Sequence, residues 1–258
     1  MIFDSHMHSR FSSDSKMNIL DAISVGKEKN IGIIITDHMD LDYPVEGEFK
    51  FDIPSYFKEY EKYRSNKVKL GIEIGLTENT LIENENIAAS NDFDFVLGSI
   101  HAVNGLDIYE EYVHQGYTKK DYFNYYFEDM LKCVQLYNNF DSLSHIDYPC
   151  RYCSFDNKEI ILDDFNDILS EIFKTLINKN KVLELNTSRL HTEEAQNSLM
   201  NIYKLYTDLG GKYVTLGSDA HSHLNIYKNF DIALKFIEEL DLKGVYFTNR
   251  KIEIMNTY

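Results

Sequence analysis

Short apolar runs rich in β-branched residues alternate with longer amphipathic stretches along the whole chain, and this alternation limits the fold more than any other feature. Repeated strand–helix units are typical of a parallel sheet covered by helices. The runs that predict strands are Ile2–His8, Ile31–His38, Val68–Leu76, Phe93–His101, Asp141–Asp147, Lys181–Ser188 and Lys212–His221, with Val245–Phe247 as a possible eighth.

The stretches between these runs predict helices. They cover Asn18–Lys29, Ile53–Arg64, Lys119–Tyr137, Leu162–Asn178, Glu193–Leu209 and Asn225–Leu240. Seven or eight strand–helix units in 258 residues favour an α/β barrel, closed or distorted, over an open doubly wound sheet. Because no linker or internal repeat interrupts the series, we expect one domain over residues 1–258.

Composition indicates where such a chain works. No stretch approaches the ~20 consecutive apolar residues of a membrane span, and the N-terminus lacks the basic and apolar regions of a signal peptide. We therefore expect a cytoplasmic protein with no membrane partner. Three cysteines suit a reducing compartment, and the lone CxxC of Cys150 and Cys153 is more typical of ordinary thiols than of a zinc or redox site.

The formal net charge is −16. Nucleic-acid binding usually needs a basic face that releases phosphate counterions, so this charge argues against a nucleic-acid partner. It does not exclude a small phosphorylated substrate, because a few basic side chains in one pocket are enough to bind it.

Histidines gather where the predicted strands end. Six of the nine histidines lie at the carboxyl ends of five predicted strands, and in a barrel those ends form the rim that carries the active site. They are His6, His8, His38, His101, His145 and His221. A single buried histidine is more often a hydrogen-bonded core residue, but that explanation does not account for six on one rim.

Carboxylates accompany the histidines. Glu73 lies among apolar neighbours in Gly71-Ile72-Glu73-Ile74-Gly75, where an unpaired carboxylate is costly unless a metal ion or a basic side chain compensates it. Imidazoles and carboxylates without thiolates are the ligands that Zn²⁺, Mn²⁺ and Fe²⁺ prefer. There are too many of them for one ion, so we expect a site in which a carboxylate such as Glu73 bridges two metals, as in phosphoryl hydrolysis.

In this order the motifs resemble those of the polymerase and histidinol phosphatase (PHP) superfamily. The matching motifs are the HxH of His6 and His8, Thr36-Asp37-His38, Glu73, Gly98-Ser99-Ile100-His101, His145 and Asp219-Ala220-His221. They span residues 6–221, most of the chain. The resemblance implies a distorted seven-stranded TIM-like (β/α) barrel and, in many members, three metal ions.

The resemblance also implies which residues bind metal. It puts His6, His8, Glu73 and Asp219 on a first ion, Glu73, His101 and His145 on a second, and Asp14, His38 and His221 on a third. Glu73, Asp219 and His221 are expected to be catalytic. Many relatives have a histidine where this chain has Asp14, so the identity and occupancy of the third ion are left open.

Within the superfamily the chain resembles the stand-alone histidinol-phosphate phosphatases. The similar segments are Phe95–His101, Ser144–Tyr148 with Arg151 following, and Glu184–Ser188. The chain departs from that group in one motif. Where relatives often read Asn-Thr-Ser-Gly-Leu-Arg, this chain reads Asn186-Thr187-Ser188-Arg189-Leu190-His191, so the basic residue has moved to Arg189.

The reaction that the resemblance implies is hydrolysis of L-histidinol phosphate to L-histidinol and phosphate in histidine biosynthesis. Arg151 is the candidate phosphate clamp and Arg189 a second phosphate-binding candidate, although a surface ion pair explains Arg151 equally well. Two alternatives stay open: a phosphoesterase that acts on nucleotides or nucleic-acid ends, and a metal-binding barrel without activity. The sequence gives no indication of the oligomeric state.

Overall fold

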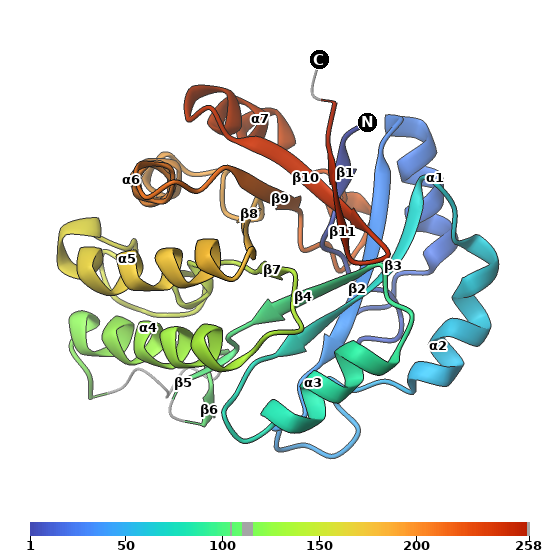
Figure 1. Ribbon diagram of the computed structural model, residues 1–258, viewed down its shortest axis with the longest axis horizontal. Coiled ribbons are helices and arrows are strands. Elements are labelled where there is room, and N and C mark those ends of the chain that lie inside the picture. The colour runs from blue at the N-terminus through green and yellow to red at the C-terminus, as the bar shows by residue number, and fades with distance from the viewer. Residues whose placement is uncertain (104, 110–115, 257–258) are drawn as a thin grey trace.

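The computed structural model describes residues 1–103, 105–109 and 116–256. A sheet of mostly parallel strands forms the centre, and the helices lie around its outside (Figure 1). The sheet order is β1-β2-β3-β4-β7-β8-β9-β10-β11. The bounds are β1 (Phe3–Asp4), β2 (Gly32–Met39), β3 (Val68–Gly75), β4 (Phe95–Ser99), β7 (Ser142–Leu143), β8 (Val182–Asn186), β9 (Tyr213–Gly217), β10 (Lys243–Thr248) and β11 (Lys251–Ile254).

Hydrogen bonds between the first and the seventh strand of the ring close the barrel. Just beyond β1 and β9, the amide of Asp219 donates to the carbonyl of His6 at 2.8 Å, and the amide of His8 donates to that of Ala220 at 2.9 Å. A parallel bridge joins Met7 and Ala220 between them. Seven strands, β1 to β4 and β7 to β9, therefore surround the core, and they are the seven predicted strands.

The predicted α/β TIM-like barrel is confirmed, but the sheet that contains it has more strands than the seven predicted. The sheet has nine strands, because β10 (Lys243–Thr248) extends the possible eighth strand and β11 (Lys251–Ile254) pairs antiparallel with it. A separate hairpin of β5 (Ala102–Val103) and β6 (Leu106–Asp107) was also missed. The strands β5 and β6 have two residues each and β11 is exposed throughout, so these three lack the apolar run on which the prediction relied.

The β10–β11 hairpin covers the amino-terminal end of the barrel. Tyr246 stacks on Phe3 with ring centroids 3.8 Å apart, and Phe247 packs against Phe95 at 5.2 Å. At the turn of the hairpin, Arg250 donates to the Asp141 carboxylate at 2.5 Å. With the amino-terminal end closed in this way, the carboxyl-terminal rim is the end available for a site.

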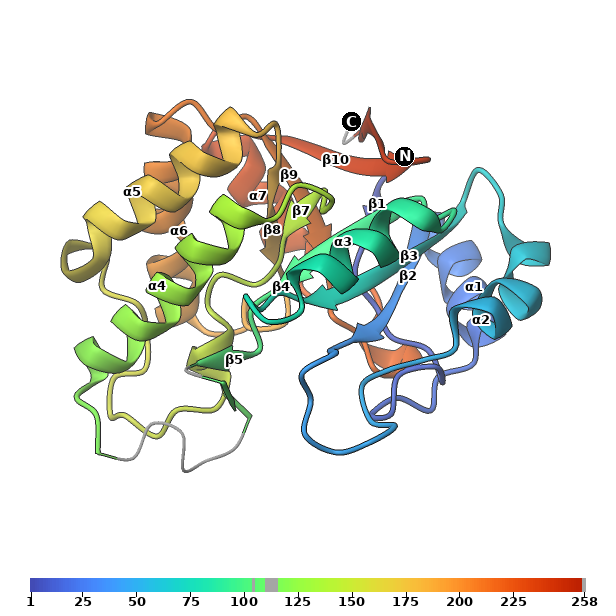
Figure 2. The same cartoon turned by 60° about the horizontal axis from the view of Figure 1, so that its bottom comes forward.

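Within the described residues, seven helices surround the barrel, and Figure 2 shows α4 and α5 lying side by side on its outer face. The helices are α1 (Ile19–Lys29), α2 (Ile53–Tyr60), α3 (Leu81–Ser90), α4 (Lys119–Leu136), α5 (Leu162–Asn178), α6 (Glu193–Asp208) and α7 (Phe230–Glu239), with 3₁₀ turns η1 (Glu61–Tyr63), η3 (Tyr148–Arg151) and η4 (His223–Asn225). Helix α3 was not predicted, because only Asn84 and Ala88 are buried and no apolar stripe marks it. No helix within the described ranges is both long and apolar enough to cross a membrane.

Candidate metal centre

The predicted rim residues converge at the carboxyl-terminal end of the barrel. His6 and His8 follow β1, His38 lies in β2, Glu73 in β3, His101 follows β4, His145 follows β7, and Asp219 and His221 follow β9. Parallel strands end at the same rim, so side chains that are far apart in the sequence reach one another there.

Four donor atoms form a first cluster: His6 Nε2, His8 Nε2, Glu73 Oε2 and Asp219 Oδ1. The two imidazole nitrogens lie 3.1 Å apart. His6 Nε2 lies 3.3 Å from both Glu73 Oε2 and Asp219 Oδ1. His8 Nε2 lies 3.4 Å from Glu73 Oε2 and 3.1 Å from Asp219 Oδ1. In a tetrahedral zinc site with bonds of about 2.0 Å, the donors lie ~3.3 Å from one another. These five distances match the spacing of donors around one cation, and His6, His8 and Glu73 form a group whose donor atoms all lie close enough to share an ion.

Glu73 turns its other oxygen toward a second cluster. Glu73 Oε1 lies 3.3 Å from His101 Nε2 and 3.2 Å from His145 Nε2. One buried carboxylate thus faces both clusters, which is the arrangement of a ligand that bridges two metal ions.

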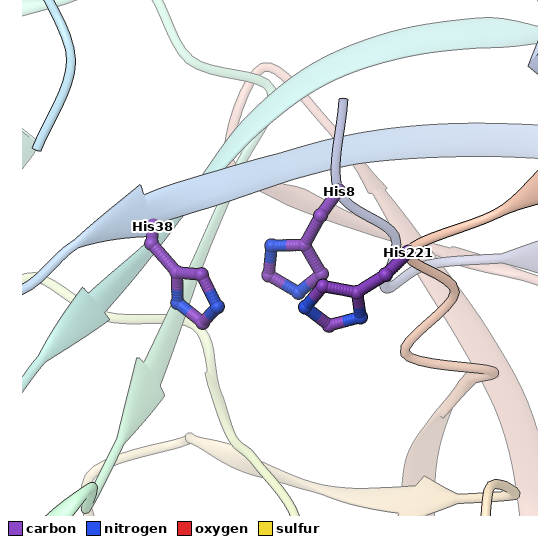
Figure 3. A group of neighbouring side chains, drawn as sticks. All are labelled: His8, His38 and His221. Atoms are coloured by element: carbon purple, nitrogen blue, oxygen red, sulfur yellow. The ribbon is translucent and has the colours of Figure 1, made fainter. Parts of the chain in front are cut away.

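A third group of imidazoles adjoins the first cluster. Figure 3 shows the rings of His8, His38 and His221 facing a common space, and the His8 ring lies 4.1 Å from that of His38 and 4.2 Å from that of His221. Asp14 Oδ2 lies 2.9 Å from His221 Nε2 and 3.6 Å from His38 Nε2. The three residues predicted to share a third ion therefore lie together, with His8 beside them.

Some of these donors are buried without a hydrogen-bond partner. Among the described residues, Glu73 Oε2 and His101 Nε2 make no hydrogen bond. An unsatisfied buried polar atom costs about 1–3 kcal/mol, so the fold maintains these atoms at a cost in stability. A divalent cation would satisfy both, and imidazole and carboxylate donors suit such an ion, so the residues present fit the expected metals.

The charges of the cluster compensate one another. Burial opposes ionisation of Glu73, but His6, His38 and His101 outweigh it and hold the pKa of Glu73 well below its usual value. Burial likewise opposes ionisation of Asp219, and the nearby His6 and Arg151 hold its pKa well below the ordinary range. Both carboxylates are therefore in the ionised form that binds cations.

The imidazoles fall into two groups. Burial and the neighbouring His38 lower the pKa of His8 to about 3, and burial with the Arg151 charge lowers the pKa of His145. These two rings are neutral, which is the form that binds metal. Although burial disfavours its charge, His6 has a pKa well above the usual value because Asp219 and other carboxylates face it. A cation bound there would displace that proton.

Two carboxylates that the sequence analysis did not assign orient the imidazoles. Glu184 Oε1 lies 2.7 Å from His6 Nδ1, and Asp40 Oδ1 lies 2.8 Å from His101 Nδ1. In both pairs the other ring nitrogen faces Glu73, so each carboxylate fixes a tautomer with Nε2 free to bind metal.

Glu184 carries the same sequence signal as Glu73, an acid inside the apolar strand Val182-Leu183-Glu184-Leu185. Space for both orienting carboxylates comes from glycines. A Cβ on Gly217 would overlap Glu184 and His6, and one on Gly75 would overlap Asp40. Any larger residue at these two positions would therefore push the carboxylate away from its imidazole.

We predict that Glu184→Gln lowers zinc affinity by about 10- to 100-fold, because a neutral amide oxygen accepts the hydrogen bond from His6 Nδ1 more weakly than a carboxylate does. Zinc titration against a competing chelator measures the effect. Asp94→Asn is the matched control, since Asp94 is another buried acid but pairs with Arg64. Equal zinc affinity in the wild type and Glu184→Gln would contradict the orienting role.

Backbone strain places the carboxylate of Asp219. Its φ of 56° lies in the left-handed region, which costs energy for a residue other than glycine. Its amide donates a hydrogen bond to the His6 carbonyl, and its carboxylate contacts the side chains of His6, His8 and Arg151. Such strain is common where a side chain must point into an active site.

A cavity of about 330 Å³ opens over the clusters, a size typical of small-molecule sites. Its lining combines metal-ligand candidates with aromatic, acidic and basic side chains: Asp14, His38, Asp40, Tyr43, Glu48, Phe49, His101, Asp107, Tyr109, His145, Tyr148, Arg151, Tyr152, Asp219 and His221.

Arg151 lies inside this site rather than in a surface ion pair. Its guanidinium donates to Asp219 Oδ2 at 2.5 Å and to Asn186 Oδ1 at 3.1 Å, and it lies over the ring of Tyr148. Its Nε is buried and donates no hydrogen bond to any described residue. A positive charge therefore lines the cavity beside the first cluster.

Arg189 lies elsewhere. Its guanidinium donates to Asp147 Oδ2 at 2.6 Å and to Glu159 Oε1, and it is not among the described residues that line the cavity. His191 contacts the carbonyl of Ser188 and is exposed. The departure from the Asn-Thr-Ser-Gly-Leu-Arg motif thus puts neither side chain over the clusters.

A family model described as "PHP domain" matches residues 4–188 of the chain. The chain belongs to the PHP domain family. The resemblance inferred from the order of the motifs is thereby confirmed, and the match covers most of the barrel strands, from β1 to β8.

Two proteins named as histidinol-phosphatases resemble the chain over most of its length. A protein named "Probable histidinol-phosphatase" from Clostridium acetobutylicum is 50% identical over 250 residues, which are 97% of this chain and 98% of that protein. The "Histidinol-phosphatase" of Lactococcus lactis is 31% identical over 229 residues, 84% of this chain and 83% of that protein.

A solved structure matches the PHP domain of this chain closely. The crystal structure of histidinol phosphate phosphatase from Lactococcus lactis, complexed with zinc, L-histidinol and phosphate, superposes with a TM-score of 0.89 and 29% identity. The match covers 98% of both chains. The fold is therefore shared with an enzyme that was crystallised with zinc, L-histidinol and phosphate.

Proposed function

We propose that this protein is a metal-dependent phosphomonoesterase that hydrolyses L-histidinol phosphate to L-histidinol and phosphate, a step of histidine biosynthesis. One observation carries the proposal: the ligand clusters lie on the rim of a fold that matches, over 98% of both chains, an enzyme crystallised with zinc, L-histidinol and phosphate. The relatives at 50% and 31% identity, both named as histidinol-phosphatases, support the same reaction.

The chain offers donors for two to three divalent ions, with zinc, manganese and iron as candidates. We assign His6, His8, Glu73 and Asp219 to the first ion, Glu73, His101 and His145 to the second, and Asp14, His38 and His221 to the third. Bound in such a site, divalent ions polarise a phosphoryl group and acidify water. The donor spacing of the first two clusters supports two ions more strongly than the looser third group.

Arg151 is our candidate for binding the phosphate. Its guanidinium is fixed by Asp219 and Asn186 and lines the cavity, so its positive charge lies beside the space that a phosphate would occupy. A guanidinium matches two phosphate oxygens and neutralises charge that grows in phosphoryl transfer. Glu73, Asp219 and His221 complete the catalytic set, and the His221 side chain, at 32% exposed, is more open to a substrate than the buried rings of His6 and His8.

The rest of the cavity suits the alcohol part of the substrate. The rings of Tyr148, Tyr152 and Phe49 offer faces for an imidazole, and the carboxylates of Asp40 and Asp107 face the same cavity and favour a cationic amine. The net charge of −16 biases the whole surface in the same direction and opposes a polynucleotide. We place the reaction in the cytoplasm, in keeping with the three free, buried thiols.

Phosphate release from a substrate panel tests the proposal. The panel holds L-histidinol phosphate, nucleoside monophosphates and single-stranded DNA with a terminal phosphate, and the metals of the same sample are measured by elemental analysis. We expect kcat/KM for L-histidinol phosphate to exceed that for every other substrate by about 100-fold or more, because only it supplies both a phosphate and a cationic amine. Faster hydrolysis of a nucleotide or a DNA end would show that L-histidinol phosphate is not the preferred substrate. No hydrolysis of any substrate by metal-loaded protein would favour an inactive barrel.

A further inference from the structure

Arg189 combines burial with a position outside the cavity. It is 8% exposed, and it lies in the segment that joins β8 to α6. Both arms of its guanidinium are occupied, one by Asp147 Oδ2 at 2.6 Å and the other by Glu159 Oε1. A buried arginine with two carboxylate partners and no contact with the cavity acts on something other than the substrate.

The partners of Arg189 mark the two ends of the segment that carries Arg151. Asp147 directly precedes η3 (Tyr148–Arg151), and its carbonyl accepts a hydrogen bond from the Cys150 amide at 2.9 Å. Glu159 lies near the other end, just before α5 (Leu162–Asn178). Arg189 therefore joins the start and the end of one rim segment, residues 147–159.

A second contact joins the segment of residues 147–159 to the region around the end of β8. Arg151, the last residue of η3, donates to Asn186 at the end of β8 at 3.1 Å. Asn186 lies three residues before Arg189, so the β8 end receives Arg151 while the following segment fixes Asp147. The two ties together define where the Arg151 guanidinium lies relative to Asp219.

Charge gives Arg189 a further effect. Without it, the buried carboxylate of Asp147 and the partly buried carboxylate of Glu159 would lack their main counter-charge. Although burial opposes its charge, the pKa of Arg151 is raised by the carboxylate of Asp219 and, less strongly, by that of Asp147, so Asp147 already attracts the Arg151 guanidinium. An uncompensated Asp147 would therefore compete with Asp219 for the Arg151 guanidinium.

We infer that Arg189 is a positioning residue, which holds Asp147 and Glu159 and thereby keeps the Arg151 guanidinium directed at Asp219 and the phosphate. The inference rests on the proposed function, in which Arg151 binds phosphate. In this inference Arg189 does not bind the phosphate directly, as the sequence analysis expected, but acts through Arg151.

A double-mutant cycle with Arg151 tests this inference. Arg189→Met keeps the apolar length of the side chain and removes the charge. We expect it to lower kcat/KM by about tenfold or more in the wild-type background and by less than about twofold in the Arg151→Ala background, since residues that act through one another are not additive. Equal losses in the two backgrounds would show that Arg189 acts independently of Arg151 and would overturn the inference.

Three further measurements separate positioning from folding. Asp147→Asn should restore part of the activity of Arg189→Met, because it removes the competing carboxylate. Arg64→Met is the matched control, since Arg64 also pairs with two carboxylates, Glu61 and Asp94, and should change kcat/KM little in either background. If Arg189→Met does not fold, Arg189→Lys takes its place, because lysine keeps the charge beside Asp147. We expect Arg189→Lys to lower kcat/KM by less than Arg189→Met would, and this loss should disappear in the Arg151→Ala background.

The cycle is run on both L-histidinol phosphate and p-nitrophenyl phosphate. Wild-type protein that cleaves only the second substrate would count against the proposed function, while the cycle would still report on Arg151. Full activity on L-histidinol phosphate with additive losses would refute the positioning role alone.

Discussion

Glu73→Gln should lower both bound metal and turnover by roughly tenfold or more. Glutamine keeps the volume of the side chain but removes the charge that faces two clusters at once, at 3.2 to 3.4 Å from the imidazole nitrogens of His6, His8, His101 and His145. Its NH₂ group would also point at one cluster, where only an acceptor can bind a cation. Because both clusters share this carboxylate, one substitution affects both.

Elemental analysis and phosphate release on the same sample measure these two losses. Thermal unfolding should be recorded with and without added zinc, because metal binding contributes to stability wherever the site forms only in the folded state. Asp94→Asn is the matched control, a buried acid at the amino-terminal end of the barrel that should lose stability but keep its metal. Full metal content with near-normal turnover in Glu73→Gln would show that this carboxylate bridges no ions.

The main features of the site followed from strand period and strand ends. An HxH at the end of an apolar run puts two imidazoles on one face, and His6 Nε2 and His8 Nε2 do lie 3.1 Å apart. The position of Glu73 within an apolar strand marked a buried carboxylate that needs a partner. In both cases a two-residue period and the burial of the sheet were enough, without knowledge of the loops.

Other features depend on contacts that no local pattern encodes. Glu184 has the same apolar setting as Glu73, but which histidine it faces is fixed only when β8 and β1 are brought together by the barrel. Asp40 lies just beyond β2 and reaches His101 only because Gly75 leaves room. The closure of the barrel itself rests on amides beyond the strand bounds, at Ser5, His8 and Asp219.

The contacts of two arginines were likewise not predictable from local sequence. Arg151 and Arg189 were both phosphate-binding candidates, since each follows a strand that ends on the rim. Loop conformation separates them, because η3 turns Arg151 toward Asp219, whereas Arg189 is turned toward Asp147 and Glu159. Charge and sequence position alone cannot distinguish a guanidinium that lines a cavity from one that ties two loops together.

Arg151→Ala should lower kcat/KM by roughly 30- to 1000-fold, which corresponds to about 2–4 kcal/mol of transition-state stabilisation from a desolvated charge on the phosphate. Bound metal should not fall, because the change leaves Asp219 without its counter-charge and so makes the first cluster more negative. The two variants therefore differ in kind: Glu73→Gln loses metal and turnover together, whereas Arg151→Ala loses turnover with its metals in place.

Steady-state kinetics on L-histidinol phosphate, with elemental analysis of the same sample, measure the Arg151 effect. Arg64→Ala controls for loss of a largely buried guanidinium, since Arg64 pairs with Glu61 and Asp94 and lies away from the rim cavity. Weaker inhibition by inorganic phosphate should accompany the loss in Arg151→Ala, because the same guanidinium would hold the product. An unchanged kcat/KM with the metals loaded would assign Arg151 to holding Asp219 in its strained conformation, and the phosphate charge would then be met by the metals alone.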